Sequence, residues 1–300
     1  MLREIIGGTG VLLCLAGGAV PPAAAQRQPA QLCRIDGRQT LPAEVRETSG
    51  LARGRRSPGV LWTHNDSGAE PELFALDEGG RVVGRVRVEG AEARDWEDLE
   101  AGPCEGGSCL YVADTGDNAG RREEVVVYRV PEPAPGDGRT APAVALRARY
   151  PEGPRDAEAL FVLPGGEVFV VTKGRHDPVT LYRFPAPLRP GETVTLERVR
   201  ELRPRPVVPF DWVTAATASP NGEWVGVRSY RALYLYRAAE LTGGGAAEPL
   251  VVDLAPLAER QGEAVAIDDD GTVRLTSEAE TEGLPGMSRL RCTLPRRRGR

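Results

Sequence analysis

Five side chains that carry oxygen atoms recur along this chain, each at the start of an apolar run. They are Ser49, Glu97, Glu158, Thr214 and Glu263, and the intervals between them are 48, 61, 56 and 49 residues. A repeat of this length is typical of a β-propeller, in which each repeat forms one blade. Equivalent side chains of successive blades would then surround one axis, as a ring of three carboxylates and two hydroxyls.

A ring of this composition could hold a metal ion. Carboxylates crowded into a narrow channel repel one another, so they need protons, arginine partners or a cation. Ligation by oxygen alone suits calcium, whereas zinc and copper fit poorly because no His or Cys converge there. We therefore expect one Ca²⁺ on the axis, held by all five residues. The alternative is a water-filled channel in which Arg94 and Arg155 neutralise the carboxylates.

A second group of polar side chains follows the second apolar run of each repeat. Because a second strand returns to the face where the first strand starts, these residues should surround the same channel mouth. They are His64, Asn65, Asp66, Asp114, Asn118, Arg121, Lys173, Arg175, Arg228 and Glu278. Polar side chains that converge on the mouth of a closed β scaffold are typical of a small-ligand site.

The chemistry expected at this mouth is binding of a small anionic molecule. Lys173 is the only lysine among 38 basic residues, which suggests a need for a compact ammonium group, although chance is the alternative. Together with Arg121, Arg175 and Arg228 it would neutralise the anion, and Asp66 or Asp114 would act as the base on a water molecule. The remaining residues of the group would contact the substrate.

Simpler structural roles are also open for these motifs. The segments around Asp66 and Asp114 could be Asx turns, and Lys173 could pair with Asp114 or Glu158. No Ser-His-Asp triad is indicated, because the two histidines, His64 and His176, are far apart in sequence. Two function classes therefore remain, since propellers host both. One is a hydrolase of a small anionic substrate such as a phosphoester, and the other is a non-catalytic binding or scaffold propeller with a structural ion.

The elements that must position these residues are short strands separated by Gly and Pro turns. The first repeat contains the run that begins Ser49-Gly50-Leu51, then 60–63, 73–76 and 82–88, and later repeats follow the same order. The fifth repeat has only three runs before the chain stops, and residues 32–35 could supply the fourth. We therefore predict an all-β, five-bladed propeller that is closed by its N-terminal strand, which removes an exposed sheet edge.

The cysteines support this closure. Cys33 lies in the proposed closing strand and Cys292 in the last strand, so we expect a disulfide between them. A bridge that closes so long a loop stabilises by about 4 to 5 kcal/mol in chain-entropy models. Cys104 and Cys109 flank a tight turn and should form a second, local disulfide. The fifth cysteine, Cys14, falls in the apolar N-terminal segment.

Residues 1–25 have the pattern of a secretory signal peptide: Arg3, an apolar run, and Ala23-Ala24-Ala25 before Gln26. The alternative is a membrane anchor, but the run is short and rich in glycine. We expect a propeller over 26–295, a solvated basic tail at 296–300, and a secreted or periplasmic monomer with no membrane contact once the signal is removed. The net charge of -5 argues against nucleic acid as a partner.

Two resemblances follow from these motifs. The ring residues are similar to the inner-strand starts of the calcium-activated nucleotidases (apyrases), which read Ser, Glu, Glu, Ser, Glu, and this implies an axial calcium. Other motifs resemble an uncharacterised group of secreted bacterial propellers. They are Trp62 to Gly68, Asp95 to Asp98, Ala113 to Asn118, Asp156 to Ala159 and Thr172-Lys173. That resemblance covers the first three blades well and the last two loosely, and it implies the fold but no activity.

Overall fold

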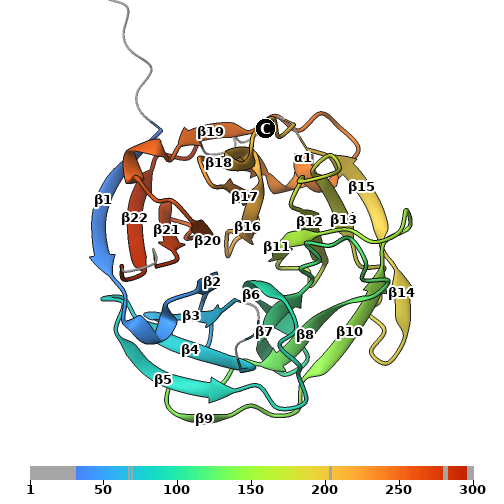
Figure 1. Ribbon diagram of the computed structural model, residues 1–300, viewed down its shortest axis with the longest axis horizontal. Helices are drawn as coiled ribbons and strands as arrows, with labels where there is room; N and C mark the ends of the chain where they lie inside the picture. Colours follow the sequence, from blue (N-terminus) through green and yellow to red (C-terminus); the bar gives the residue numbers. More distant parts are fainter. Residues whose placement is uncertain (1–31, 67, 69, 203–204, 280–282, 296–300) are drawn as a thin grey trace, which may run out of the picture. The chain divides into compact units, whose positions relative to one another are not determined.

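The computed structural model describes residues 32–66, 68, 70–202, 205–279 and 283–295, and their strands form five sheets arranged around one axis (Figure 1). The five-bladed β-propeller expected from the sequence is confirmed. The predicted signal peptide and basic tail lie outside the described residues. Within the described part of the chain, no helix has the length and apolar character needed to cross a bilayer.

Each blade consists of four strands in meander order, and two blades gain an extra short strand at the outer edge. From the axis outward, the first three blades are as follows. Blade one has β2 (Thr48–Arg53), β3 (Val60–Asn65), β4 (Glu72–Asp77), β5 (Val82–Arg87) and the added β9 (Gly138–Arg139). Blade two has β6 (Trp96–Cys104), β7 (Gly107–Asp114), β8 (Val125–Pro131), β10 (Val144–Arg149) and the added β14 (Thr193–Thr195). Blade three has β11 (Ala157–Val162), β12 (Val168–Thr172), β13 (Thr180–Arg183) and β15 (Glu197–Glu201).

The last two blades complete the ring. Blade four has β16 (Val213–Ala218), β17 (Trp224–Ser229), β18 (Ala232–Arg237) and β19 (Leu250–Asp253), with the short helix α1 (Ala238–Thr242) after β18. Blade five has β20 (Gly262–Ile267), β21 (Thr272–Ser277) and β22 (Gly286–Cys292), and its outer strand is β1 (Cys33–Thr40). The last blade therefore combines both ends of the described chain, as the missing fourth run predicted.

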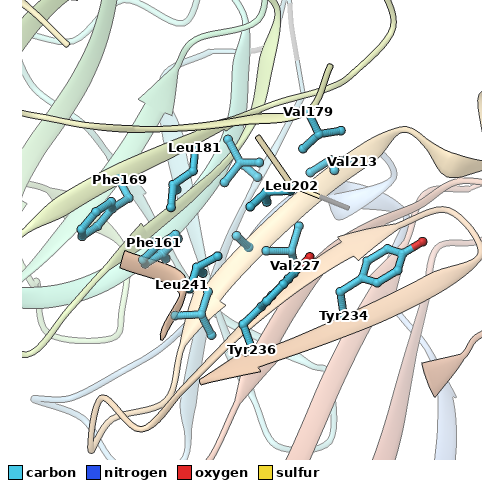
Figure 2. Packing of buried hydrophobic residues seen from close by; sticks show 14 of the residues in the cluster. Phe161, Phe169, Val179, Leu181, Leu202, Val213, Val227, Tyr234, Tyr236 and Leu241 are labelled. Carbon is cyan, nitrogen blue, oxygen red and sulfur yellow. The ribbon is translucent and has the colours of Figure 1, made fainter. Parts of the chain in front are cut away.

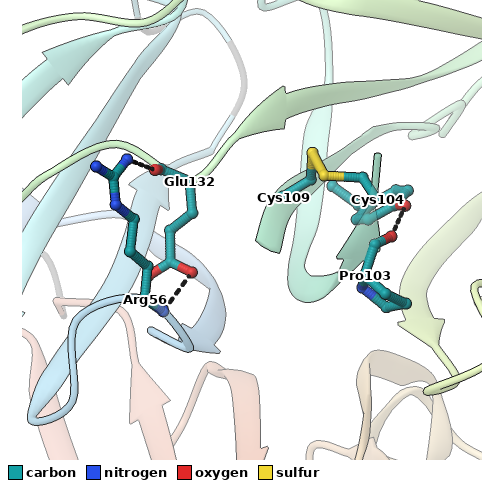
Figure 3. The surroundings of a disulfide bond; sticks show 6 residues. Arg56, Pro103, Cys104, Cys109 and Glu132 are labelled. Carbon is teal, nitrogen blue, oxygen red and sulfur yellow. Dashed lines mark hydrogen bonds between the residues drawn. A yellow bond between two sulfur atoms is a disulfide. The ribbon is translucent and has the colours of Figure 1, made fainter. Parts of the chain in front are cut away.

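Both predicted disulfides are present. Cys33 lies directly opposite Cys292 in the antiparallel β1–β22 pair, and the two sulfurs are bonded. Cys104 and Cys109 close the tight turn between β6 and β7, beside Pro103 (Figure 3). The Tyr111 hydroxyl donates a hydrogen bond to the carbonyl of Pro103 at 2.7 Å, which adds a second tie across this hairpin.

The hydrophobic core is divided among the interfaces between neighbouring blades. Among the described residues, five clusters of buried side chains occur, and each combines residues from two adjacent blades. Figure 2 shows the cluster between blades three and four, where the rings of Phe161 and Phe169 stack with their centroids 4.7 Å apart. Side chains on the faces of each blade therefore pack against the neighbouring blades, and the inner strands line the axis.

Every inner strand has a β-bulge close to its first residue. The pairing with the second strand skips one residue in each blade: Gly50, Glu97, Glu158, Thr214 and Glu263. A bulge re-aims the side chain of the unpaired residue, and bulges are common next to functional sites. In blades two to five the skipped residue is the predicted ring residue. In blade one it is Gly50, while Ser49 pairs with His64.

The blade-one register follows from packing. Gly50 has a φ of +64°, which favours glycine, and a Cβ atom there would lie 2.6 Å from the backbone nitrogen of Leu99. Blade one therefore places a glycine where the other four blades place an oxygen-bearing side chain. The sequence repeat aligns Ser49 with the other ring residues, but the bulge shifts it by one position.

Candidate functional site

The three ring carboxylates are buried at the start of their inner strands. Glu97, Glu158 and Glu263 are 6%, 3% and 7% exposed. Burial raises the pKa of Glu158 and of Glu263 to about 8. Burial also raises the pKa of Glu97 well above its usual range, and the negative charges of Glu158 and Asp66 raise it further. These pKa directions mean that burial and neighbouring carboxylates disfavour the ionised forms, so each group needs a proton or a cation.

The two ring hydroxyls connect neighbouring inner strands. Ser49 Oγ donates to the backbone carbonyl of Glu97 at 2.6 Å, and Thr214 Oγ1 donates to the carbonyl of Gly262 at 2.8 Å. Each hydroxyl group therefore forms a hydrogen bond to the inner strand of the next blade. The hydroxyl proton is donated in this bond, although the lone pairs of the oxygen could still face a cation.

Lys173 is the cation that faces this ring. Its Nζ atom lies 2.6 Å from Glu158 Oε1, and both side chains are buried. Although burial alone would lower the pKa of the ammonium, Glu158 raises it, so the lysine stays charged. Of the two roles that the sequence leaves open for Lys173, the structure therefore shows the pairing with Glu158.

Three carboxylates meet at the boundary between blades one and two. One oxygen each from Asp66, Asp95 and Glu97 lies within 4.8 Å of the other two. Asp66 follows β3, and Asp95 immediately precedes β6. Desolvation and the nearby charge of Asp66 raise the pKa of Asp95. Sequence reasoning quoted Asp95 in a motif but missed it as a site residue, although its position two residues before Glu97 was a usable signal.

Further acidic groups extend this cluster across the mouth. Burial raises the pKa of Glu278 to about 7, with Asp66 as the largest charged contributor. The Glu278 side chain also accepts a hydrogen bond from Gln261 Nε2 at 2.9 Å. Tyr230, which sequence reasoning missed, follows β17, and burial together with the nearby Glu263 carboxylate raises the pKa of its hydroxyl. No repeat motif marks this tyrosine, because it lies in the loop beyond the strand.

Asp114 does not reach the mouth as a free base. Its carboxylate is 2.8 Å from the guanidinium of Arg122, the pair is almost fully buried, and Asp114 also accepts a hydrogen bond from the backbone nitrogen of Asp95. Arg122 further donates to the carbonyls of Gly116 and Asp114. The predicted catalytic role of Asp114 is therefore corrected to a structural one, in which the ion pair holds the loop after β7.

Arg228 is a second correction. It is fully buried between blades four and five, where it donates to the carbonyls of Ala264 and Thr276 and pairs with Glu259. A guanidinium with these partners supports the wall of the propeller. It is not available to neutralise an anion at the mouth.

His64 and Asn65 also hold the structure rather than line the opening. His64 is fully buried, packs edge-on against Trp96, and its pKa falls to about 4 because burial disfavours the charged ring. The Asn65 amide donates to the carbonyl of Glu44 and accepts from the backbone nitrogen of Glu47. These two residues fix the end of β3 and thereby the position of Asp66.

The remaining predicted residues lie on an exposed surface beside the mouth. Arg175 donates to Asn118 Oδ1 at 2.7 Å, and its guanidinium lies 5.3 Å from the ring centroid of Trp212. Arg121 is exposed, and its backbone nitrogen donates to the Asp117 side chain four residues earlier, which ties this loop together. Arg175 and Arg121 are the predicted basic side chains that stay near solvent.

The channel below the ring is crossed by two further carboxylates of β6. Asp98 Oδ2 accepts hydrogen bonds from the backbone nitrogens of Leu160 and Ala216, at 2.8 and 3.0 Å. Glu100 Oε2 accepts from the Thr217 hydroxyl and from the backbone nitrogen of Ala218, both at 2.9 Å. Strand β6 is therefore tied to β11 and β16 across the axis, and the acidic mouth has a floor.

Comparisons with known proteins support the fold alone. No protein-family model matches the chain, and no curated protein matches it. A PQQ-bound aldose sugar dehydrogenase from Streptomyces coelicolor is similar in structure, with a TM-score of 0.51 and 10% sequence identity over 87% of this chain and 98% of that chain. The periplasmic gluconolactonase of Pseudomonas aeruginosa gives a TM-score of 0.39 and 19% identity over 83% of this chain and 71% of that chain.

Proposed function

We propose that the chain is an exported, calcium-containing propeller that binds and hydrolyses a small anionic substrate, such as a phosphoester, at the channel mouth. The observation that carries this proposal is the crowding of carboxyl groups at the mouth. Seven carboxylates influence one another there: Asp66, Asp95, Glu97, Asp156, Glu158, Glu263 and Glu278. The single ammonium that faces them, Lys173, is already paired with Glu158.

This charge distribution changes how an anion would be bound. A substrate oxyanion would be repelled by the mouth unless a divalent cation stood between it and the carboxylates. Calcium accepts six to eight oxygen ligands and keeps positions for water and substrate. Carboxylates whose ionised forms are disfavoured by burial and by one another fit this ion. When bound, it would polarise a substrate oxygen and lower the pKa of a coordinated water.

The residues at the mouth would then have separate roles. Asp66 remains the candidate base, because it is half-buried at the mouth, whereas Asp114 is held by Arg122. The exposed guanidinium groups of Arg175 and Arg121 lie beside the mouth and could steer an anion toward it. The floor formed by Asp98 and Glu100 would keep the substrate at the surface of the propeller.

Export is part of the same proposal. The N-terminal pattern of a signal peptide and the two disulfides both suit an oxidising compartment, where structural disulfides persist. The alternative function is a binding or scaffold propeller in which the ion only holds blades together. The burial of Glu97 at the boundary of two blades favours that alternative, so the experiment must separate the two.

The test measures calcium and turnover separately on the oxidised protein without residues 1–25. Isothermal titration of chelator-treated protein with CaCl₂ should show binding, and a panel of phosphoesters, lactones and glycosides should be assayed with calcium and with chelator. Turnover that needs calcium supports the enzyme. Calcium binding without turnover supports the scaffold, and no calcium binding would contradict both forms of the proposal.

A further inference from the structure

We infer that the cation lies off the axis, in a cradle formed by Asp66, Asp95 and Glu97 between blades one and two. The inference rests on the proposed function, because it assigns the position of the ion that the function requires. It differs from the axial ring expected from the sequence, which shares only Glu97 with this cradle. Asp66 changes role as well, from a base to a ligand.

The spacing of the three carboxylates fits one ion. Their nearest oxygens all lie within 4.8 Å of one another. Oxygen ligands of calcium lie about 2.3 to 2.6 Å from the ion, so two ligands on opposite sides of it are separated by at most about 5 Å. One cation can therefore contact all three oxygens. Such a set would leave several positions for water or for the oxygens of a bound ligand.

Glu97 supplies an independent observation that points to a ligand. Its side chain is only 6% exposed, and one of its oxygens is among the three that converge. No hydrogen bond or ion pair from another described residue reaches the Glu97 carboxylate. No ion pair from a described residue reaches the Asp95 carboxylate either. A buried carboxylate without a donor is costly when it is ionised, so it must take up a proton or a cation. The convergence of Asp66 and Asp95 on the same point favours the cation.

The axial residues, in contrast, already have partners within the protein. Glu158 is paired with Lys173, and Glu263 lies beside the hydroxyl of Tyr230. The hydroxyls of Ser49 and Thr214 both donate to backbone carbonyls. The axis is therefore largely satisfied, whereas the buried carboxylate of Glu97 receives no hydrogen bond from another described residue. A cation would therefore be stabilised most by the carboxylates at the boundary between blades one and two.

Gly116 explains how the cradle closes. A Cβ atom at this position would lie 2.0 Å from Glu97 Oε1 and 2.5 Å from Asp95 Oδ2. The two carboxylates therefore approach the backbone at a place that only glycine leaves open. The backbone nitrogen of Gly116 also bonds to the carbonyl of Asp95 at 3.3 Å, which ties the loop after β7 to the start of β6. This gives a structural reason for glycine in the Asp114 to Asn118 motif.

Calcium is the ion that we assign to the cradle. Its donors are three carboxylates, and no His or Cys is among them, which disfavours zinc and copper. Magnesium requires near-ideal octahedral geometry with short bonds and keeps most of its waters, so a loosely spaced set suits it less well than it suits calcium.

The experiment compares variants of the cradle with a variant of the axis. Calcium affinity is measured by isothermal titration on chelator-treated, oxidised protein, and Tb³⁺ emission sensitised by tryptophan gives a second signal, because Trp96 lies between Asp95 and Glu97. Glu97→Gln, Asp95→Asn and Asp66→Asn should each weaken calcium binding by about 10-fold or more. Glu263→Gln, the matched axial variant, should change affinity by less than about 3-fold, because its loss removes no ligand.

Gly116→Ala gives a test that removes no carboxylate. The added methyl group must displace Glu97 and Asp95, so calcium affinity should fall. Gly244→Ala, whose Cβ would meet no atom, should leave calcium affinity unchanged.

Glu97→Gln also relieves the repulsion between like charges in the cradle. In chelator its melting temperature should therefore match or exceed that of the unaltered protein, yet the rise on adding calcium should disappear.

The outcomes separate the inference from the function on which it rests. Loss of binding in Glu263→Gln, with cradle variants that still bind, would place the ion on the axis and overturn the inference while the proposed function stands. Absence of calcium binding by the unaltered protein would overturn both. A melting temperature of Glu97→Gln that still rises with calcium as in the unaltered protein would also reject the cradle.

Discussion

Lys173 is the single lysine of the chain, and its ammonium group is buried beside Glu158. Removing one partner of a buried ion pair leaves a charge without compensation. Lys173→Met should therefore lower the free energy of unfolding by about 3 kcal/mol, and Lys173→Arg should recover much of it. Urea unfolding measures both, and full stability of the Met variant would contradict the structural role. The double variant Lys173→Met, Glu158→Gln should lose less than Lys173→Met alone, because it leaves no isolated carboxylate.

Asp114 gives a second test at the scale of the residue. Asp114→Asn breaks the buried pair with Arg122, so we expect a loss of about 3 kcal/mol in the free energy of unfolding. The matched control is Glu197→Gln, which breaks the exposed pair with Arg183 and should cost less than about 1 kcal/mol. If the two variants lose equal stability, the pair with Arg122 does not hold the loop. Calcium affinity measured on the same samples shows whether that loop supports Asp95.

Individual side chains were the least predictable part of the site. The repeat predicts that Glu97, Glu158 and Glu263 start inner strands, and this holds. It offers Glu158 only as one of two possible partners of Lys173, and it does not predict the pairing of Arg122 with Asp114. Arg228 was assigned to the mouth because it lies near a strand end, but its long side chain turns into the wall. Side-chain direction depends on packing that a single sequence does not reveal.

At the scale of the element, the bulge of each inner strand sets where the site residues point. The sequence predicts the four main strands of each blade and their order, because alternating apolar residues and turn residues are local signals. It does not predict the added strands β9 and β14. It does not predict the one-residue shift in blade one, where Gly50 takes the bulge position and Ser49 pairs with His64. Register depends on the contact of Gly50 with blade two, which is a tertiary feature.

Strand β6 offers a prediction about pH. Burial raises the pKa of Glu100 to about 7, against 4.5 for an ordinary glutamate, although it accepts hydrogen bonds from Thr217 and Ala218. The native state therefore binds this proton more tightly than the unfolded state does. The stability contributed by the proton is complete below pH about 4.5 and is lost as the pH rises through about 7.

Glu100→Gln removes this titration and keeps an oxygen that can accept the bonds from β16. Urea unfolding between pH 5 and pH 8 should show that the unaltered protein loses more stability than the variant as the pH rises. The difference between the two curves isolates Glu100 from the carboxylates of the mouth. Parallel curves would mean that Glu100 does not carry its proton in the native state.

At the scale of the whole molecule, closure of the ring determines whether five blades act as one unit. The predicted closing strand and both disulfides are confirmed, and the long-range bond joins residues 259 positions apart, against 5 for the local one. The sequence could predict this feature because an incomplete last repeat and the four cysteines outside the apolar N-terminal segment constrain the topology. Chain-entropy models give about 5 kcal/mol for so long a loop and about 2 kcal/mol for the short one.

The last prediction compares these two bonds directly. The paired variant Cys33→Ser, Cys292→Ser should lose more unfolding free energy than Cys104→Ser, Cys109→Ser, because the first bond restricts nearly the whole unfolded chain. Urea unfolding of both variants gives the two losses. Hydrogen exchange should also show that β1 and β22 lose protection first in the first variant, since opening the ring exposes the edge of blade five. Equal losses, or exchange that spreads evenly over all blades, would show that packing between blades closes the ring without help from the disulfide.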